Sequence, residues 1–381
     1  GGQWTIFDSG RGVHTGSNDE ALYANNNDAE TNYEYLEFNS TGFQLKTTSG
    51  DVNASATYLY VAIRRPDGYV GKPAEAGTDV FNVVAGNSGG GTDTTAVYIP
   101  GFALDFALQR RVTTTFNMDA VSRLTGSKYL YTNTNGAEQN YNPYVWDYSD
   151  GWCSDASADS NFYSWMWKRG QGFDVVAYTG NGTGGHQISH SMNKTPEMIW
   201  AKNRDEIQGW RVYHKGLNGG TNPEQYRLIL NLDGTESSSS TAWNDTSPTS
   251  STFTLGTDNA VNENNKDHIA MLFASVAGIS KVGSFSGVAS ASYPLTVTTG
   301  FAPRFIMIKA RAGASYGWFV WDSVRYSGSD NLKLALNDTA AQDSGTTYQY
   351  FNDAPISTNS TGFSIVDDGW GSTSGVEFIY Y

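Results

Sequence analysis

The chain has 381 residues, with 24 Lys and Arg against 38 Asp and Glu, so its formal net charge at pH 7 is −14. Sequence-independent nucleic-acid binding needs clustered Lys and Arg to neutralise phosphates, so no nucleic-acid partner is expected. No apolar run approaches the roughly twenty residues that a membrane helix requires, so no membrane insertion is expected either. The single cysteine, Cys153, excludes an internal disulfide framework, and without an accompanying base it is expected to be a packed side chain.

The composition is typical of an all-β protein. The chain contains 42 Gly, 23 Tyr and 11 Trp, and only 16% of its residues are charged. Aromatic residues favour strands, while Gly, Asn and Asp favour the turns between them. Residues 175–178 and 305–308 are apolar on both alternating faces, which predicts strands in the middle of a sandwich.

Internal matches indicate a repeat. The pentapeptide Asn-Ser-Thr-Gly-Phe occupies residues 39–43 and again residues 359–363. Residues 196–204 align with residues 303–311, and their first residues are 303 − 196 = 107 positions apart. We therefore predict a repeat unit of roughly 100 residues, which is large enough to bury a core of its own.

Four copies follow along the chain, and the first and last share a Trp, Asp and Arg set. In the first copy, residues 1–70, a strand is predicted over residues 58–63. The second, most divergent copy covers residues 79–169, the third residues 173–277 and the fourth residues 278–381. The shared set is Trp4, Asp8 and Arg11 in the first copy and Trp318, Asp322 and Arg325 in the fourth.

The second copy keeps some of these features. Residues 116–123 have the seven-residue interval that separates Trp4 from Arg11, so Phe116 is expected to take the place of Trp4. Residues 102–108 alone resemble a helix, but the matching segment of the fourth copy holds Pro303 and two isoleucines, which favour a strand.

The predicted fold is a series of tandem antiparallel β-sandwiches, jelly-roll or lectin-like, with a junction near residues 170–172. The first copy lacks the opening strands of the third, and the fourth stops short of the first. We therefore expect a segment of a longer polypeptide, with exposed strand edges at both ends.

Metal and catalytic sites have weak support. His186 and His190 have metal-ligand spacing only on a helix, and on the expected strand they would lie about 13 Å apart. Three acidic loops, at residues 25–28, 258–267 and 367–369, offer oxygen ligands, so calcium is the one metal considered. None matches a defined calcium loop, and turn formation is the favoured explanation for their Asn and Asp residues. No other cofactor is expected.

One cluster of aromatic residues and carboxylates is a candidate glycan or receptor site. Its rings could stack on sugars while its acids bind hydroxyl groups, although the same rings could instead close an irregular core. The candidate residues are Trp146, Asp147, Tyr148, Asp150 and Trp152. By contrast, a set that recurs in several copies is expected to serve folding, with its aspartates accepting from the backbone or from Arg at a strand end.

Several segments carry a family resemblance, most specifically within residues 173–381. They resemble an uncharacterised repeat domain of large structural proteins from tailed marine bacteriophages, proteins usually described as tail-fibre-like or lectin-like. The segments are residues 172–183, 188–190, 196–204, 210–215 and 243–248.

The resemblance implies a non-enzymatic virion component, made in the host cytoplasm and placed on the particle surface, where it contributes to host attachment. Its expected partners are other virion proteins, copies of itself and a host surface glycan. Two alternatives stay open: a carbohydrate-binding or glycan-cleaving module, and a bacterial surface adhesin. Glycan cleavage would need two carboxyl groups about 5–10 Å apart in a groove, and the sequence singles out no such pair.

Overall fold

The computed structural model describes residues 3–8, 13, 18–39, 42–63, 76–87, 96–141, 144–146, 148, 150–154, 159–289, 292, 294–325, 332–342, 357–365 and 374–381. These residues form an all-β protein of several antiparallel sheets with a few short helical turns. No described helix is long and apolar enough to span a bilayer.

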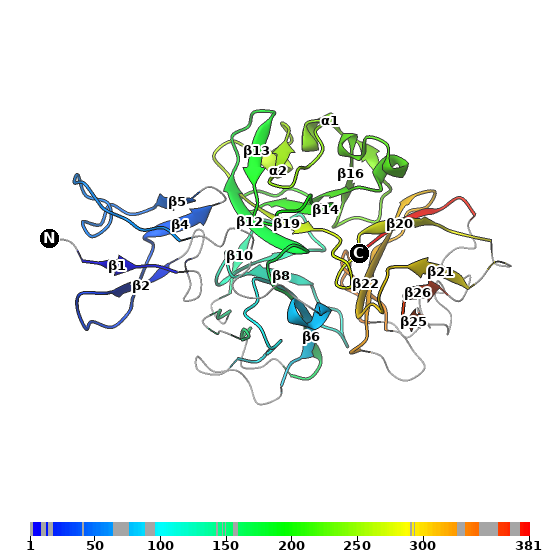
Figure 1. The fold of residues 1–381 in the computed structure, drawn as a ribbon, viewed down its shortest axis with the longest axis horizontal. Coiled ribbons are helices and arrows are strands. Elements are labelled where there is room, and N and C mark those ends of the chain that lie inside the picture. Colours follow the sequence, from blue (N-terminus) through cyan, green and yellow to red (C-terminus); the bar gives the residue numbers. More distant parts are fainter. Residues whose placement is uncertain are drawn as a thin grey trace.

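The N-terminal strands form an arm, residues 3–63, that projects from the rest of the molecule (Figure 1). One sheet of the arm has the order β1-β2-β3, and β4 pairs with β5. The strands are β1 (Thr5–Ile6), β2 (Asp19–Tyr23), β3 (Thr31–Tyr33), β4 (Leu36–Asn39) and β5 (Gly42–Leu45).

Sheet I has six strands in the order β10-β9-β8-β7-β11-β6. A short helix, η1 (Gly77–Asp79), leads into it. Its strands are β6 (Phe81–Ala85), β7 (Phe106–Arg111), β8 (Asp119–Ser122), β9 (Lys128–Tyr131), β10 (Gln139–Asn140) and β11 (Phe162–Trp167).

Sheet II has the order β12-β19-β14-β15-β16-β17, and the pair β13-β18 packs with two short helices on its outer face. The sheet strands are β12 (Phe173–Thr179), β14 (Met198–Asn203), β15 (Arg211–His214), β16 (Tyr226–Ile229), β17 (Ser237–Ser238) and β19 (Asp267–Phe273). The other elements are β13 (His186–Ser189), η2 (Leu217–Gly220), η3 (Pro223–Gln225), α1 (Ser240–Trp243), β18 (Thr252–Leu255) and α2 (Asn259–Asn262).

Sheet III has the order β20-β27-β22-β23-β24, and a second layer has the order β21-β26-β25. The sheet strands are β20 (Gly283–Ser286), β22 (Phe305–Ala312), β23 (Trp318–Asp322), β24 (Leu334–Ala335) and β27 (Glu377–Tyr380). The second layer consists of β21 (Leu295–Thr298), β25 (Ser357–Asn359) and β26 (Gly362–Ile365).

The three sheets have the same pairing register. The central strand of each sheet pairs with the next strand in the chain on one side and with a later strand on the other. The central strand is β7 between β8 and β11, β14 between β15 and β19, and β22 between β23 and β27. The corresponding residues are Gln109 with Asp119 and Ser164 in sheet I, Ala201 with Arg211 and Ala270 in sheet II, and Ile308 with Phe319 and Tyr380 in sheet III. Residues 196–204 and 303–311 therefore hold the same place in their sheets.

Turn geometry recurs with the register. Gly101 and Gly300 each lie five residues before the strands β7 and β22, and their φ angles are 90° and 92°. This left-handed conformation is open to glycine and strained for most other residues, which explains the recurring glycine of the Gly-Phe-Ala tripeptide.

A hydrogen bond from a backbone N–H to an asparagine side chain recurs in the arm and in all three sheets. The pairs are Trp4 with Asn25 (2.8 Å), Met118 with Asn133 (3.2 Å), Trp210 with Asn231 (3.0 Å) and Trp318 with Asn337 (2.8 Å). Met118, and not Phe116, thus takes the place of Trp4, so the sequence alignment of the second copy was wrong by two residues. Its seven-residue interval ends at Arg123, which serves a different purpose in the outer core.

The sheets close into a ring at three seams, and an equivalent backbone hydrogen bond recurs at each of them. The amides of Glu138, Glu236 and Gln342 donate to the carbonyl oxygens of Arg204, Arg311 and Val112, in that order, each over 2.7 Å. Sheet II thereby contacts sheet I, sheet III contacts sheet II, and sheet I contacts sheet III. The three donors are equivalent by register, and so are the three acceptors.

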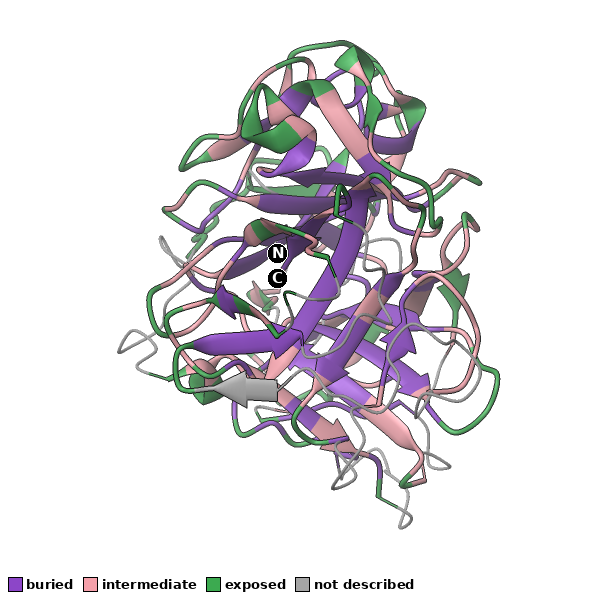
Figure 2. Cartoon of the chain, turned by 90° about the vertical axis from the view of Figure 1, so that its right-hand side faces the viewer, coloured by how far each residue is buried: buried purple, intermediate pink, exposed green. Residues whose placement is uncertain are grey.

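A shared core fills the inside of this ring. Side chains from the inner faces of all three sheets form one buried cluster, which includes Trp165, Trp200, Trp210 and Trp318. The outer face of each sheet buries a separate cluster. Figure 2 shows buried residues along the central strands and exposed residues in the loops around them.

Two expectations about the ends need correction. Residues 58–63 are not a strand, because the equivalent strands β11, β19 and β27 pair with β7, β14 and β22, and no described strand precedes β1 in the arm. At the other end β27 lies inside sheet III, and Tyr381 continues its pairing by exchanging backbone hydrogen bonds with Met307 (2.7 and 3.0 Å). An open edge is therefore present in the arm but not at β27.

The seam between sheets I and II allows a direct test of ring closure. Arg204 and Glu138 form a buried ion pair there, with 2.7 Å between nitrogen and oxygen. We expect Arg204→Val to lower the free energy of unfolding by about 3–5 kcal/mol, because it removes the cation closest to the buried carboxylate of Glu138 and leaves only Lys128, whose nitrogen lies 4.0 Å away. Denaturant unfolding measures this change.

The third seam supplies the control, because it carries Val112 and Gln342 at the equivalent positions. The double variant Arg204→Val with Glu138→Gln should recover most of the lost stability. A single variant as stable as the wild type would show that the ion pair does not support the seam.

Candidate functional site

The predicted aromatic site lies in the outer core of sheet I. Trp146 and Trp152 are 2% and 0% exposed. Their rings stack on each other with centroids 5.3 Å apart and planes inclined by 16°. Each indole N–H is satisfied inside the protein, by the Gly126 carbonyl oxygen and by Ser164 Oγ, both at 3.0 Å.

This placement corrects the expectation of an exposed aromatic surface. Neither indole is available to stack on a sugar ring, because both faces and both N–H groups are used within the protein. Of the remaining candidates, Asp150 is exposed and Tyr148 is half-buried, while Asp147 lies outside the described residues. The two tryptophans instead close the irregular core of this copy, as the other interpretation of the cluster predicted.

The position of Trp146 is fixed by Arg123. The guanidinium carbon lies 5.7 Å from the Trp146 ring centroid, and Arg123 donates to the backbone carbonyl oxygens of Leu104, Trp146 and Tyr148. Cys153, in the same cluster, is 4% exposed, as expected for a packed side chain.

A buried carboxyl lies next to this cluster. Asp119 Oδ2 accepts a 2.6 Å hydrogen bond from the Tyr144 hydroxyl. Burial raises the pKa of Asp119 to about 7, against the opposing effect of that hydrogen bond. Perturbed carboxyl groups are common in active sites, but this one is buried and bonded to Tyr144 of the aromatic cluster.

The histidines and acidic loops serve local structure. His186 Nδ1 lies 2.9 Å from Asn262 Oδ1, and His190 Nε2 lies 3.2 Å from the Thr249 carbonyl oxygen. Asp258 accepts from the Ala260 amide at the start of α2. No cluster of three or more His, Cys, Asp or Glu suited to a metal occurs among the described residues, and the loop at 367–369 lies outside them.

The recurring Trp, Asp and Arg set also has a structural role in the fourth copy. Asp322 accepts from the amides of Val324 and Arg325 at the end of β23, and it forms an ion pair with the Arg325 side chain (2.6 Å). It also accepts from Trp165 Nε1 of sheet I (2.9 Å). The predicted acceptor role of this aspartate is confirmed, whereas Arg11 lies outside the described residues.

Sequence reasoning missed three buried cations, Arg110, Lys202 and Lys309, which are equivalent by register and fully buried. Burial lowers the pKa of Lys309 to about 7 and that of Lys202 to about 8. Each cation donates to backbone carbonyl oxygens. Lys309 reaches Asp233 (2.8 Å) across the seam, and Arg110 reaches Ala335 (2.9 Å). Aligning the copies strand by strand would have revealed this column of cations.

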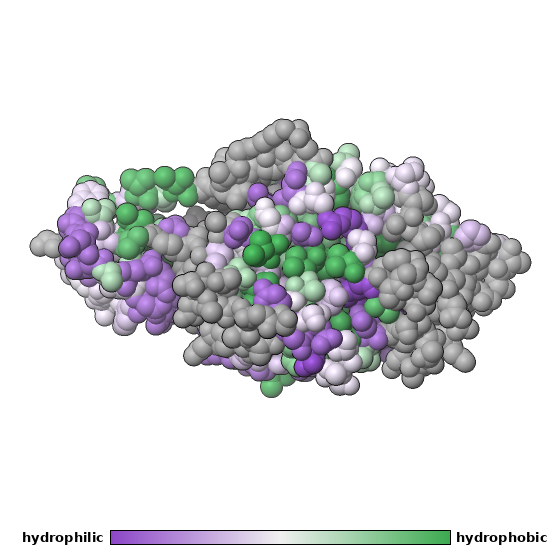
Figure 3. Space-filling model, turned by 90° about the horizontal axis from the view of Figure 1, so that it is seen from below, coloured by the Kyte–Doolittle hydropathy of each residue, from purple (hydrophilic) through white to green (hydrophobic). Residues whose placement is uncertain are grey.

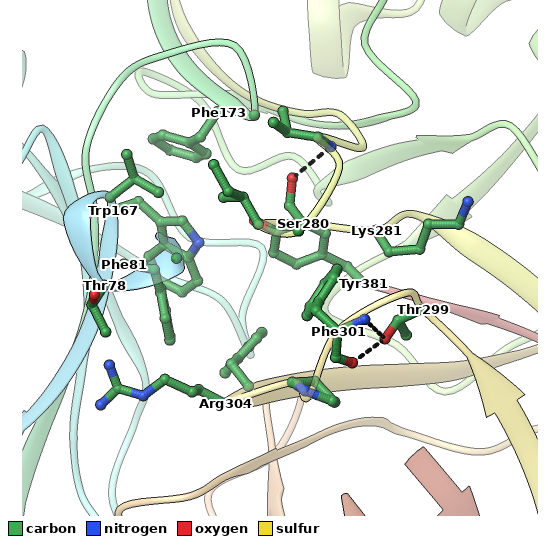
Figure 4. Close-up of a pocket in the computed structure, with 18 of the residues that line it drawn as sticks. Thr78, Phe81, Trp167, Phe173, Ser280, Lys281, Thr299, Phe301, Arg304 and Tyr381 are labelled. Carbon is green, nitrogen blue, oxygen red and sulfur yellow. Dashed lines mark hydrogen bonds between the residues drawn. The ribbon is translucent and has the colours of Figure 1, made fainter. Parts of the chain in front are cut away.

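The sequence analysis also missed a cavity of about 180 Å³ where the three sheets meet. Aromatic side chains line much of it, including Phe81, Trp167 and Phe173 (Figure 4). A difference between the copies marks this place in the sequence. Phe81 and Phe173 begin equivalent strands, whereas the residue at the same register in sheet III is the smaller Ser280.

The burial of Trp146 predicts a large effect on stability. We expect Trp146→Ala to lower the free energy of unfolding by about 3–5 kcal/mol, because it removes a stacked ring and leaves a cavity. Thermal or denaturant unfolding measures it. Asp150→Ala, at an exposed position of the same segment, should change stability by less than about 0.5 kcal/mol. Equal effects of the two changes would contradict the assignment to the core.

The buried acid predicts a dependence on pH. Folded Asp119 keeps its proton up to about pH 7, whereas an unfolded aspartate loses it near pH 4, so the stabilisation is present below about pH 4 and is lost as the pH rises through 7. Asp119→Asn stays neutral throughout. Relative to wild type, its stability should therefore rise by about 1 kcal/mol per pH unit between pH 4 and 7. If the free energies of unfolding of wild type and Asp119→Asn changed with pH in parallel, the raised pKa of Asp119 would be contradicted.

The chain was compared with known protein families, curated proteins and solved structures. The family described as a domain of unknown function, DUF7483, matches residues 1–65 and 78–381. No curated protein and no solved structure matches the chain. Because the match covers almost the whole sequence, the chain belongs to the DUF7483 family.

Proposed function

We propose that the chain is a non-enzymatic structural component of a phage virion. It is a tail-fibre, appendage or other particle-surface protein that contributes to host attachment. In this proposal the chain consists of four related β-sandwich copies of about 100 residues, three of which form the ring. The single observation that supports it best is the closed ring, in which three equivalent backbone hydrogen bonds of 2.7 Å join the sheets.

Ring closure supports a structural role because it commits the inner face of every sheet to the shared core. The buried ion pairs Arg204–Glu138 and Arg311–Glu236, both at 2.7 Å, stabilise two of the seams. Most of the buried charges described above therefore have partners that hold the architecture together. Charged residues that stabilise the architecture in this way fit a structural role on a particle better than a role in catalysis.

The arm supports the proposed contacts with other virion proteins or with copies of the chain. Leu59, Val61 and Ile63 are 88%, 89% and 94% exposed. Figure 3 shows hydrophobic surface at the end of the molecule where the arm lies. The missing pairing of residues 58–63 leaves backbone donors and acceptors that an added strand from a neighbour could satisfy.

Mass spectrometry of purified particles tests the proposal. We expect peptides from this chain to copurify with capsid and tail proteins at a fixed ratio after a density gradient and a high-salt wash. Its presence on bacterial surfaces instead would favour the adhesin alternative. Release of reducing sugars from host glycan by the purified protein would favour a glycan-cleaving module. Either result, together with absence from particles, would overturn the proposal.

A further inference from the structure

The hydrogen bond between Tyr144 and Asp119 lies beside a continuous series of aromatic rings in the outer core of sheet I. On one side, the Tyr144 ring contacts Trp152 with centroids 5.7 Å apart, and Trp152 stacks on Trp146. On the other side, the Tyr144 ring lies 5.7 Å from that of Tyr129. An aromatic path thus runs from Trp146 through Trp152 and Tyr144 to Tyr129. Among aromatic side chains, those of Tyr and Trp lose an electron most readily, so electrons can move along this path.

The path leads from the buried core to half-buried phenols. Tyr144 is 6% exposed, whereas Tyr129, Tyr131 and Tyr141 are half-buried. The rings of Tyr131 and Tyr141 lie 5.1 and 6.4 Å from that of Tyr129. The Tyr129 hydroxyl donates to Oε1 of Gln139, which is exposed, over 2.9 Å. An oxidant in solution therefore meets the Tyr129 end of the path first.

Tyr144 differs from Tyr129 in the group that accepts its proton. The Tyr144 hydroxyl donates to the carboxyl oxygen Asp119 Oδ2 over 2.6 Å, whereas the Tyr129 hydroxyl donates to the neutral amide of Gln139. A phenol that loses an electron becomes a strong acid, and it passes its proton to a base only within hydrogen-bond reach. Of the two phenols, Tyr144 is the one with a carboxyl group in that position.

The surroundings of this pair couple the loss of the proton to the loss of the electron. The pKa of Tyr144 lies well above its ordinary value, because burial and the charge of Asp119 both disfavour the phenolate. Loss of the proton alone is therefore unfavourable. Asp119 can accept a proton only when it is ionised, and because its pKa is about 7, it is ionised above neutral pH.

The titratable groups around Asp119 are phenols. Its charge raises the pKa values of Tyr98 and Tyr129 as well as that of Tyr144. On the neighbouring strands Asp119 pairs with the uncharged Gln109 and with Tyr131. The Tyr98 hydroxyl accepts from Gln109 Nε2 over 3.1 Å. These contacts leave the 2.6 Å hydrogen bond from Tyr144 as the direct route for a proton to Asp119.

We propose that Tyr144 is a redox-active tyrosine, which a one-electron oxidant at the surface oxidises through Tyr129 while Asp119 takes up the phenolic proton. The oxidant, a photoexcited or high-valent species, gains one electron from the Tyr129 ring. An electron from Tyr144 then refills that ring, the O–H bond of Tyr144 breaks, and a new O–H bond forms at Asp119 Oδ2. The products are the oxidant reduced by one electron, a neutral tyrosyl radical and a neutral carboxyl group. This activity goes beyond the proposed structural role and does not rest on it.

Laser-flash oxidation of the full chain tests the proposal, with ruthenium(III) tris-bipyridine generated in the flash as the oxidant. At about pH 8, where Asp119 is ionised, we expect a long-lived neutral tyrosyl radical, detected by its absorbance and by electron paramagnetic resonance. Tyr144→Phe removes only the hydroxyl and should abolish this signal. Tyr163→Phe, at a half-buried tyrosine of β11, is the matched control and should leave it unchanged. Absence of the radical in the wild type, or its survival in Tyr144→Phe, would overturn the proposal.

Two further variants separate the proton acceptor from the electron path. Asp119→Asn keeps the size of the side chain but cannot take up the proton, so radical formation should slow by about 100-fold, a usual contribution of a positioned base. Tyr129→Phe interrupts the path while Tyr144 and Asp119 remain, so the same radical should form more slowly. Near-UV circular dichroism verifies the aromatic packing of each variant.

The two variants also give outcomes that would contradict the roles assigned here. A folded Asp119→Asn variant that forms the radical as fast as the wild type would exclude Asp119 as the proton acceptor. An unchanged rate in Tyr129→Phe would exclude the path through Tyr129. None of these results depends on whether the chain is found in particles.

Discussion

The backbone hydrogen bond at each seam is the constraint on which the rest of the ring depends. It joins the end of β7, β14 or β22 to the neighbouring sheet, so the position of each sheet is set by the other two. Each inner sheet face is buried only when all three seams are closed, because the shared core draws side chains from all three sheets. Their stability is therefore expected to be cooperative rather than a sum of independent units.

The buried cations follow from the same geometry. Strands that end at a seam leave carbonyl oxygens turned toward the neighbouring sheet, and each oxygen needs a donor once water is excluded. Trp210 and Trp318 supply indole N–H groups to Tyr131 (2.9 Å) and Ile229 (3.2 Å). Sheet I has Met118 at that position, which cannot donate. Arg110 reaches the third equivalent carbonyl oxygen, that of Ala335, so a different side chain meets the same requirement.

The sequence predicted the all-β class and the positions of β12, β14 and β22, because strands buried on both faces show as continuous apolar runs. It did not predict the register of the second copy, because Met118 replaces the tryptophan and only the bond to Asn133 marks the equivalence. The prediction of a strand at residues 58–63 was wrong, because apolar and β-branched residues form a strand only where a partner strand is present. Ring closure was not predicted, because the recurring seam bond joins backbone groups and side-chain ion pairs mark only two of the three seams.

The aromatic cluster was misjudged for a related reason. The outer faces of sheets II and III are covered by the pairs β13-β18 and β21-β26. In the described part of sheet I, that layer is reduced to two isolated bridges, Tyr98 with Trp152 and Val145 with Cys153. A sheet face without a covering hairpin must be buried by large side chains, so the tryptophans fill the volume that backbone and aliphatic residues occupy elsewhere. Departure from a repeat therefore marks a change in how the core is closed before it marks a binding surface.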